Sequence, residues 1–394
     1  ADAAKAYHQA LDLLPSAPLS DERRTELREV VLACLSRSNL LAADFSNLVS
    51  GYQYLLKHAK PTFNPWRAAT LLYVAEGYYR QRLYDQALGI YKEVLSTFPA
   101  APESMLAVDG TAWAYFSKGE YAKAFETWQR LPALSRRPPV APAKTVLPDG
   151  KVSDDILVAA EFEAGTSRFN QKKYLEALEA YEAFAKAHAK HALALEAAMQ
   201  TGWCYYRLEY YAQALKTWEG IETSFPDSPQ ASKAAWAIAD TYFRAGKHEP
   251  AIATYERILQ KYPQDQAANY ARLRIAQSHY NAKDMMKAVG AFESLIQTSP
   301  DSPEAAQVLD FLTQLLYQPD GSGAALDALE RIANARAASP VGSSARFRIA
   351  THFYEKGDHG AVVTNLEPLI GRLSGRSELM DAEFFVADSY YQLK

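Results

Sequence analysis

Apolar residues recur at intervals of three and four along most of this chain, and the segment 232–262 shows the pattern plainly. It reads SKAAWAIADTYFRAGKHEPAIATYERILQKY, and each half gathers its apolar residues on one face of a helix. Gly246 interrupts the pattern between the halves, as glycine commonly does where a helix ends. Ala239 and Ala251 are small enough to let two helices cross closely, and Tyr255 would fill space beside them. The segment therefore predicts a helix, a short turn and a second helix.

Two columns of residues repeat this helix pair along the chain. The first is alanine, at intervals of 37, 53, 37, 37, 37, 37 and 36 residues: Ala87, Ala124, Ala177, Ala214, Ala251, Ala288, Ala325 and Ala361. The second lies eight residues earlier and is aromatic throughout: Tyr79, Phe116, Phe169, Tyr206, Phe243, Tyr280, Tyr317 and Phe353, with Tyr391 a further 38 residues on. A single helix pair cannot bury its apolar faces alone, so neighbouring pairs must stack. The columns predict a linear array with a period of 37 residues.

The connections between successive pairs repeat as well. Residues 225–229 read FPDSP and residues 299–303 read SPDSP. The first proline of each stops the outgoing helix, because proline lacks the N–H that a helix interior needs. Ser228 and Ser302 can cap the next helix, and the proline that follows each suits a first turn. Local chemistry and the long-range period thus predict the same boundaries.

The period divides the chain into four parts. Residues 1–65 are helical but off the period, with helices expected at 2–14, 20–37 and 40–58, and we interpret them as an N-terminal helical cap or a degenerate repeat. Residues 66–133 form a first repeat block. Residues 134–154 carry four prolines and account for the 53-residue interval, so we expect an extended loop there. Residues 155–394 form a second block that ends in an incomplete repeat.

The proline-rich loop and the incomplete last repeat leave alternatives open. The loop is either a passive insertion, a segment that docks a partner, or a hinge between the two blocks. The helix pattern of 382–391 has no second helix after it, from which we expect the natural protein to be longer.

Composition narrows the function classes. The formal net charge of −4 over 394 residues gives no basis for nucleic-acid binding, which needs a concentrated basic face. No apolar run approaches the roughly 18 residues that a membrane helix needs, so any membrane tether would lie outside this sequence. Cys34 and Cys204 lie in no metal-ligand spacing, and we interpret both as buried thiols.

Catalytic and metal-binding motifs are absent from the sequence. There is no HExxH, GxSxG, GxxxxGK[ST] or GxGxxG, and no nucleophile has an apparent base. His188 and His191 are the only close histidines, with Glu196 as the nearest carboxylate, and we interpret them as an exposed turn. The run Gly321-Ser322-Gly323 is interpreted as a turn. We expect no catalytic residues, no metal and no cofactor, and hence not an enzyme.

The best repeats resemble the tetratricopeptide repeat. The unit at 195–228 supplies its pattern of small, aromatic and proline positions: Gly202, Tyr205, Tyr211, Ala214, Trp218 and Pro226. The resemblance covers roughly 68–394 and weakens near 306–340 and 342–374. It implies an all-α fold, a right-handed superhelical α-solenoid of about eight helix pairs plus the N-terminal cap. It also implies a non-enzymatic scaffold that binds a protein or peptide, with an oligomeric state that the sequence leaves open.

A narrower resemblance concerns location. The 37-residue period, the FPDSP linkers and double aromatics such as Tyr78-Tyr79 look like those of bacterial envelope tetratricopeptide proteins. These include the outer-membrane assembly lipoprotein and the Tol–Pal-associated coordinator of cell division. The resemblance implies a periplasmic or outer-membrane-associated protein, with a cytoplasmic one as the alternative.

In the family, the first helix of each pair lines the concave groove that holds the partner. Transferred to this sequence, that arrangement predicts groove residues rich in aromatics and arginine, which dominate protein interfaces. They are Glu76, Tyr79, Arg80, Trp113, Phe116, Trp203, Tyr206, Arg207, Trp236, Asp240, Phe243, Arg244, Tyr270, Gln277 and Tyr280. The aromatic column itself has the alternative of packing between first helices. Trp113, Trp203 and Trp236 lie off the column, and we expect them to be exposed.

One groove position decides between known binding modes. Where a carboxylate clamp or an asparagine ladder would have asparagine, this chain reads Glu76, Trp113, Thr166, Trp203, Asp240 and Gln277. The sequence therefore favours an extended or helical protein segment as the partner. The leading hypothesis is a protein-interaction scaffold of a bacterial cell-envelope complex. The alternatives are the repeat segment of an exopolysaccharide export or secretion system, and a glycan-binding envelope protein.

Overall fold

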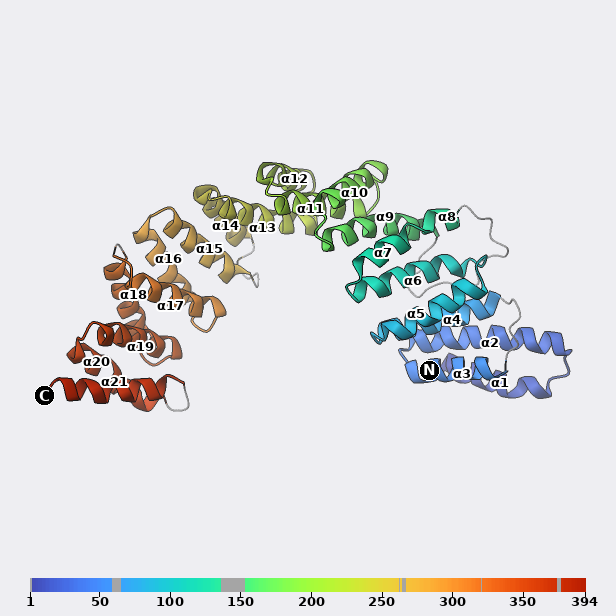
Figure 1. Ribbon diagram of the computed structural model, residues 1–394, viewed down its shortest axis with the longest axis horizontal. Helices are drawn as coiled ribbons and strands as arrows, with labels where there is room; N and C mark the ends of the chain where they lie inside the picture. The colour runs from blue at the N-terminus through green and yellow to red at the C-terminus, as the bar shows by residue number, and fades with distance from the viewer. Residues whose placement is uncertain are drawn as a thin grey trace. The chain divides into compact units, whose positions relative to one another are not determined.

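The computed structural model describes residues 2–58, 65–135, 153–261, 263, 267–319, 321–373 and 377–394, and the elements in them are helices (Figure 1). Most of the expected loop at 134–154 and of the break before residue 65 lies outside these ranges. The chain forms two compact units, Ala1–Thr217 and Trp218–Lys394, which we call the N-terminal and C-terminal units.

The N-terminal unit contains three cap helices and then repeat pairs. The cap helices are α1 (Asp2–Leu13), α2 (Asp21–Leu41) and α3 (Phe45–His58), with a 3-10 turn η1 (Leu14–Ser16). The repeat pairs are α4 (Pro65–Arg80) with α5 (Tyr84–Thr97), α6 (Glu103–Ser117) with α7 (Tyr121–Trp128), and α9 (Ser153–Asn170) with α10 (Tyr174–Ala187). A short α8 (Leu131–Ser135) follows α7, and α11 (Leu193–Arg207) precedes α12 (Tyr211–Ser224). The division of the chain into two units falls within the residues of α12.

The C-terminal unit continues the same order of first and second helices. Its pairs are α13 (Pro229–Arg244) with α14 (His248–Lys261), α15 (Ala268–Asn281) with α16 (Met285–Thr298), α17 (Pro303–Leu316) with α18 (Ser322–Ala335), and α19 (Pro340–Glu355) with α20 (His359–Leu366). A 3-10 segment η2 (Glu367–Arg372) extends α20, and α21 (Glu378–Gln392) is the last element. Each described helix of this unit packs against the next one along the chain.

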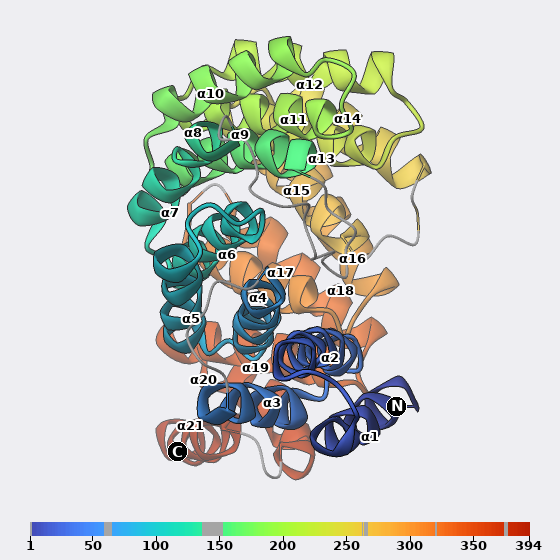
Figure 2. The ribbon, with the colours of Figure 1, turned by 90° about the vertical axis from the view of Figure 1, so that its right-hand side faces the viewer.

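The cap differs slightly from its prediction. The expected helices 20–37 and 40–58 are instead α2 and α3, with their turn at 42–44 rather than 38–39. Leu40 is fully buried in α2, so apolar packing carries that helix a further turn. α2 packs against α1, α3 and α4, and Figure 2 shows these helices together within the N-terminal unit.

Serine and proline set the starts of several first helices, as the sequence indicates. The side chain of Ser228 accepts a hydrogen bond from the Ala231 N–H, and Pro229 opens α13. Ser302 does the same for α17, and Ser339 for α19. These hydroxyls satisfy N–H groups that have no partner inside the helix.

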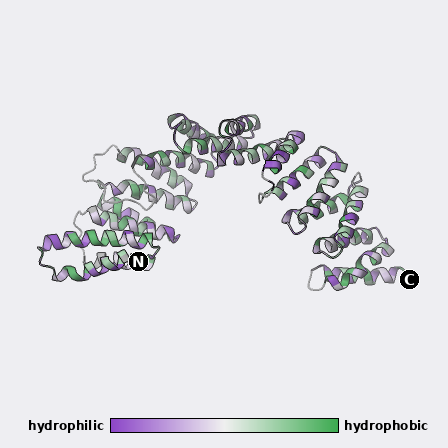
Figure 3. Cartoon of the chain, turned by 180° about the vertical axis from the view of Figure 1, so that it is seen from behind, coloured by the Kyte–Doolittle hydropathy of each residue, from purple (hydrophilic) through white to green (hydrophobic). Residues whose placement is uncertain are grey.

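Small residues let the paired helices approach. The alanine column is fully buried from Ala87 to Ala325, which confirms the close crossing that the repeat predicts. Four residues further along, each second helix buries a large side chain: Tyr91, Trp128, Tyr181, Trp218, Tyr255, Phe292, Leu329 and Leu366. Hydrophobic and hydrophilic residues alternate along the helices in Figure 3, as expected when one face is buried in the stack.

In the last complete pair, the predicted aromatic and alanine columns are each wrong by one residue. In earlier pairs the turn residue with positive φ lies three positions after the column aromatic, as Gly246 follows Phe243. The corresponding residue here is Gly357, which makes Tyr354 the column member and not Phe353. Val362 is fully buried in the alanine position, whereas Ala361 is only half-buried. The period is therefore an unbroken 37 residues from Phe169 to Tyr391.

Candidate protein-binding surface

The predicted groove residues all lie on first helices. In the N-terminal unit they come from α4, α6 and α11, and in the C-terminal unit from α13 and α15. Within the N-terminal unit α4 contacts α6, α6 contacts α9 and α9 contacts α11, so these first helices lie side by side. The arginines Arg80, Arg207 and Arg244 are exposed, and the other predicted residues are half-buried.

The column aromatics pack chiefly within their own pair. Each ring lies against the first residue of the following second helix, with centroids 5.1–6.5 Å apart: Tyr79–Tyr84, Phe116–Tyr121, Phe169–Tyr174, Tyr206–Tyr211, Phe243–His248 and Tyr354–His359. Two hydroxyl groups also reach the next repeat, at Ser117 in α6 and at Gln318 just after α17. The Tyr79 hydroxyl lies 3.1 Å from Ser117 Oγ, and Tyr280 donates to Gln318 Oε1 at 3.0 Å.

Three residues before the column aromatic lies a polar side chain, which is Glu76, Thr166 or Asp240 in three of the repeats. A tyrosine from the second helix of the same pair interacts with it. Tyr181 donates its hydroxyl to Thr166 Oγ1 at 3.0 Å, and Tyr255 donates to Asp240 Oδ1. Burial and then the neighbouring Glu76 and Asp109 carboxylates raise the pKa of Tyr91 well above its usual value, because its phenolate would be desolvated and repelled. These polar residues therefore fix the helix pair from within, besides facing the surface.

Tryptophan replaces this hydrogen-bonded pair in the second repeat. Trp113 stands at the same position, and its ring meets Trp128 edge-to-face at 5.3 Å. Trp128 donates its indole N–H to Asp109 Oδ1 at 2.9 Å. The expectation that Trp113, Trp203 and Trp236 are exposed is wrong, since all three are half-buried. Each ring leaves only part of its surface for a partner.

An aromatic cluster around one arginine occupies the surface of α13 and α15. The Arg274 guanidinium lies 4.6 Å from the Phe243 ring centroid and 4.8 Å from that of Tyr270. Tyr270 donates its hydroxyl to Asp240 Oδ1 at 2.9 Å, and Arg274 Nη1 donates to Gln277 Oε1 at 2.9 Å. A cation between two rings is held in place by their electrostatics. We call these five residues the Arg274 cluster.

Arg274 was missed by the sequence analysis although its neighbours were predicted. It lies six residues before the column aromatic Tyr280, a position that holds no arginine in the better repeats from which the pattern was drawn. Arg348 occupies the same position relative to Tyr354 and was also missed. Only the corrected register of that repeat makes the equivalence visible.

Arg348 lines a surface pocket of about 250 Å³ on the first helices of the C-terminal unit. Its guanidinium donates to Asp310 Oδ1 at 2.6 Å and to Thr313 Oγ1 at 3.1 Å, which fixes its direction. The remaining lining comes from Ser344, Phe347, Thr351 and Glu378. Hydroxyls and a fixed arginine make this pocket suited to a polar side chain of a partner.

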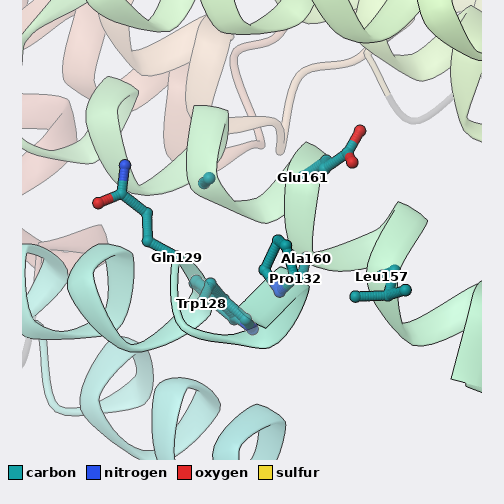
Figure 4. Close-up of a pocket in the computed structure, with 7 residues that line it drawn as sticks. Trp128, Gln129, Pro132, Leu157, Ala160 and Glu161 are labelled. Atoms are coloured by element: carbon teal, nitrogen blue, oxygen red, sulfur yellow. The ribbon is translucent and has the colours of Figure 1, made fainter. Parts of the chain in front are cut away.

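A second pocket, of about 370 Å³, lies where α7 and α8 meet α9 (Figure 4). Trp128, Pro132 and Leu157 line it together with Ala160 and Ala164, and Gln129 and Glu161 add polar groups. Five residues before the column aromatic, the later first helices carry larger side chains where this one has Ala164: Thr201, Ile238, Ile275, Leu312 and Ile349. The small side chain accounts for the space.

The histidine pair is held differently from the prediction. His188 Nε2 lies 2.7 Å from Glu161 Oε2, not beside Glu196, and its ring packs on Phe184 at 4.9 Å. The His188 and His191 ring centroids are 6.4 Å apart. Among the residues that the structure describes, no group of three histidine, cysteine or acidic side chains could hold a metal ion. A search of the same residues finds no helix long and apolar enough to cross a membrane.

Comparison with known families agrees with this architecture. The family model of the tetratricopeptide repeat matches residues 75–138, 162–229, 205–266 and 237–303, just over half of the chain. The chain belongs to the tetratricopeptide repeat family. It is an all-helical repeat protein of a fold that is generally a non-enzymatic scaffold for protein and peptide partners. No curated protein matches the sequence.

Several solved structures are similar to this chain at low sequence identity. A tetratricopeptide repeat protein of Parabacteroides merdae is 15% identical, with a TM-score of 0.42 over 73% of this chain and 99% of its own. PilF of Pseudomonas aeruginosa is 16% identical, with a TM-score of 0.40 over 61% and 95%. PilW, a type IV pilus biogenesis factor, is 16% identical, with a TM-score of 0.43 over 61% and 98%.

Proposed function

We propose that this protein is a non-catalytic scaffold of a bacterial cell-envelope complex that holds a segment of a partner protein on its first-helix surface. The Arg274 cluster carries the proposal. It gathers rings, a guanidinium and a carboxylate that are already fixed by mutual contacts. Binding to such a surface orders few side chains, so little of the interaction free energy is lost to entropy.

The composition of the surface supports a protein segment as the ligand. Half-buried Trp236 and Tyr270 offer flat apolar area, and the exposed Arg244 lies one residue from Phe243 on the same helix. Aromatic and arginine side chains contribute most of the binding free energy in protein interfaces. In the N-terminal unit, Trp203 and Tyr206 pack edge-to-face at 5.5 Å beside the exposed Arg207, which repeats the same combination.

The envelope location rests on the sequence. The 37-residue spacing and the FPDSP linker are the features that resemble envelope members of the family. We propose a periplasmic or outer-membrane-associated protein on that ground, and the partner would then be another envelope protein.

Variants of the two tryptophans test this function. The protein is immobilised and exposed to bacterial envelope extract, and retained proteins are compared between the wild type, Trp203→Ala and Trp236→Ala. We expect at least one specific protein to be lost from both variants while circular dichroism shows the helices intact. Glu256→Ala, an exposed change on the second helix α14, is the matched control and should retain it.

Two results would contradict the proposal. If both tryptophan variants retain every partner that the wild type retains, the first-helix surface does not bind them. If the wild type instead retains purified glycan strands and no protein, the glycan-binding alternative replaces the scaffold.

A further inference from the structure

Two of the described repeats lack the ring that elsewhere begins the second helix and packs on the column aromatic. In six described pairs, the first residue of the second helix is tyrosine or histidine and its ring lies 5.1–6.5 Å from the column ring. In α16 this residue is Met285, and the Tyr280 ring packs on Phe311 instead, with centroids 4.7 Å apart. In α18 it is Ser322, five positions after the column aromatic Tyr317. The run Gly321-Ser322-Gly323, interpreted as a turn, is therefore corrected: Ser322 begins a helix and occupies a position that carries a ring in six other described pairs.

The missing ring leaves a cavity of about 410 Å³. It is lined by Leu316, Tyr317, Gln318, Pro319, Ser322, His352, Glu355 and Lys356. Tyr317 is 53% exposed, whereas the column aromatics with a ring beside them are half-buried. The open face of Tyr317 is thus the face that other repeats cover.

His352 adds buried polar groups to this cavity. It comes from α19 and meets the Tyr317 ring edge-to-face at 5.4 Å. Its side chain is only 2% exposed, and neither ring nitrogen has a hydrogen-bond partner among the described residues. Burying an imidazole without a hydrogen-bond partner costs free energy, and a ligand that supplies a hydrogen-bond partner lowers that cost.

We propose that this cavity binds a polar-tipped aromatic ring, in first place the phenol of a tyrosine, supplied by a bound protein segment. The ring would stand where Tyr84, Tyr121, Tyr174 and Tyr211 stand in their own repeats. The affinity of the cavity for a phenol does not depend on the proposed scaffold function. Only the source of the ring, a bound protein segment, rests on that function.

The polar lining explains the preference for a phenol over a plain hydrocarbon ring. Glu355, Lys356 and Gln318 lie around the cavity beside His352. Gln318 already accepts from Tyr280, and Glu355 accepts from Tyr317, whose pKa is raised to about 12 by burial first and then by that carboxylate. A hydroxyl on the incoming ring can reach the unpartnered imidazole, whereas a hydrocarbon would leave it unpaired.

Binding of p-cresol, the side-chain analogue of tyrosine, tests the cavity without any partner. Saturation-transfer NMR on the full chain should show specific, millimolar binding of p-cresol and about tenfold weaker binding of toluene, since a site that hydrogen-bonds a hydroxyl disfavours the analogue without it. Ser322→Tyr places the ring in the chain itself and should abolish p-cresol binding. Ser322→Ala is the matched control that keeps the cavity open and should bind p-cresol as the wild type does.

A second variant separates the polar contact from packing. His352→Leu should retain p-cresol binding but lose the preference over toluene, which a purely structural histidine would not produce. The proposal is overturned if p-cresol binds equally to the wild type and to folded Ser322→Tyr. It is also overturned if methyl glucoside binds the wild type and p-cresol does not. The tryptophan variants of α11 and α13 leave this cavity intact, so loss of the scaffold function and loss of the cavity are distinguishable.

Discussion

His359 at the start of α20 and Ser389 in α21 lie within hydrogen-bond distance, with Nδ1 3.2 Å from Oγ. One repeat earlier, the same two residue types stand at the same two positions in exchanged order, Ser322 at the start of α18 and His352 in α19. Between α20 and α21, His359 thus has a hydrogen-bond partner. Between α18 and α19, neither ring nitrogen of His352 has a hydrogen-bond partner among the described residues.

Exchanging Ser322 and His352 tests this relationship. His352→Ser alone should destabilise the protein by about 1–2 kcal/mol, because it removes a buried ring. Adding Ser322→His should recover at least half of that loss by recreating the arrangement of His359 and Ser389. Urea unfolding followed by circular dichroism measures the free energies, and a coupling of about 1 kcal/mol is expected. Strictly additive single effects would show that the two side chains do not share one space.

The same histidine predicts a loss of stability in acid. Burial, and secondarily Lys356, lower the pKa of His352 below its ordinary value of 6.5, while Glu355 opposes them. Tyr317 and Ser322 face it from the neighbouring helices and carry no charge near neutral pH. The unfolded chain therefore binds a proton at higher pH than the folded one, so stability falls as the pH drops through about 6.5.

His352→Leu provides the comparison for this pH dependence. Unfolding midpoints measured from pH 8 to pH 5 should fall less steeply for the variant than for the wild type. The other seven histidines remain in both proteins, so their contribution cancels. Parallel curves would contradict the prediction.

A glycine in α6 makes room for the buried Tyr91. A Cβ atom on Gly110 would lie 2.3 Å from Tyr91 Cζ, well inside contact distance. Gly110→Ala should therefore cost about 2–3 kcal/mol through overpacking, despite the higher helix propensity of alanine. Gly89→Ala in α5 is the matched control, because no atom lies within 4 Å of its Cβ position, and it should be neutral or stabilising by up to about 1 kcal/mol. Thermal unfolding of both variants decides the matter.

The hydroxyl of Tyr255 ties the second helix α14 to Asp240 on the candidate surface. Tyr255→Phe should destabilise the protein by about 1.5–3 kcal/mol, because a buried hydrogen bond to a carboxylate is lost. Tyr242→Phe removes an exposed hydrogen bond to Glu219 at 3.2 Å and should cost less than about 0.5 kcal/mol. Equal losses in urea unfolding would mean that Asp240 is solvated and not fixed by Tyr255.

The two thiols should differ in reactivity. Cys204 is fully buried, and burial raises its pKa to about 12, so almost no thiolate exists near neutral pH. Cys34 is only half-buried, which corrects the expectation that both are buried. Iodoacetamide at pH 8, followed by mass spectrometry, should label Cys34 first and Cys204 only after denaturant is added. Simultaneous labelling of both in the native protein would contradict this.

The sequence by itself determined the repeat, because helix periodicity, glycine and proline stops and serine caps are local properties. Gly246 ends α13 and Ser228 caps it as the residues alone indicate. The alanine column identified a fully buried position of the second helix in each pair from Ala87 to Ala325, as expected where two backbones cross closely. The placing of all the predicted surface residues on first helices follows from the same period.

Only the tertiary structure decided how much of each predicted surface residue is buried against its own helix pair. Glu76, Trp113 and Asp240 were predicted as groove residues from their position, yet contacts with the second helix behind them bury part of each side chain. The register of the last complete pair also needed the structure, because Phe353 and Tyr354 are both aromatic and one residue apart. Which of two adjacent rings faces the turn depends on packing that no local pattern encodes.

The cavity beside Tyr317 is the clearest case of what the sequence could not determine. Ser322 looked like part of a turn, and His352 was one of eight scattered histidines. Their relationship exists only when α18 and α19 are packed together, since they are 30 residues apart in the chain. The sequence determined a repeat with a ring at a fixed place. The structure decided where that ring is missing, because empty space is a property of neighbours and not of any one residue.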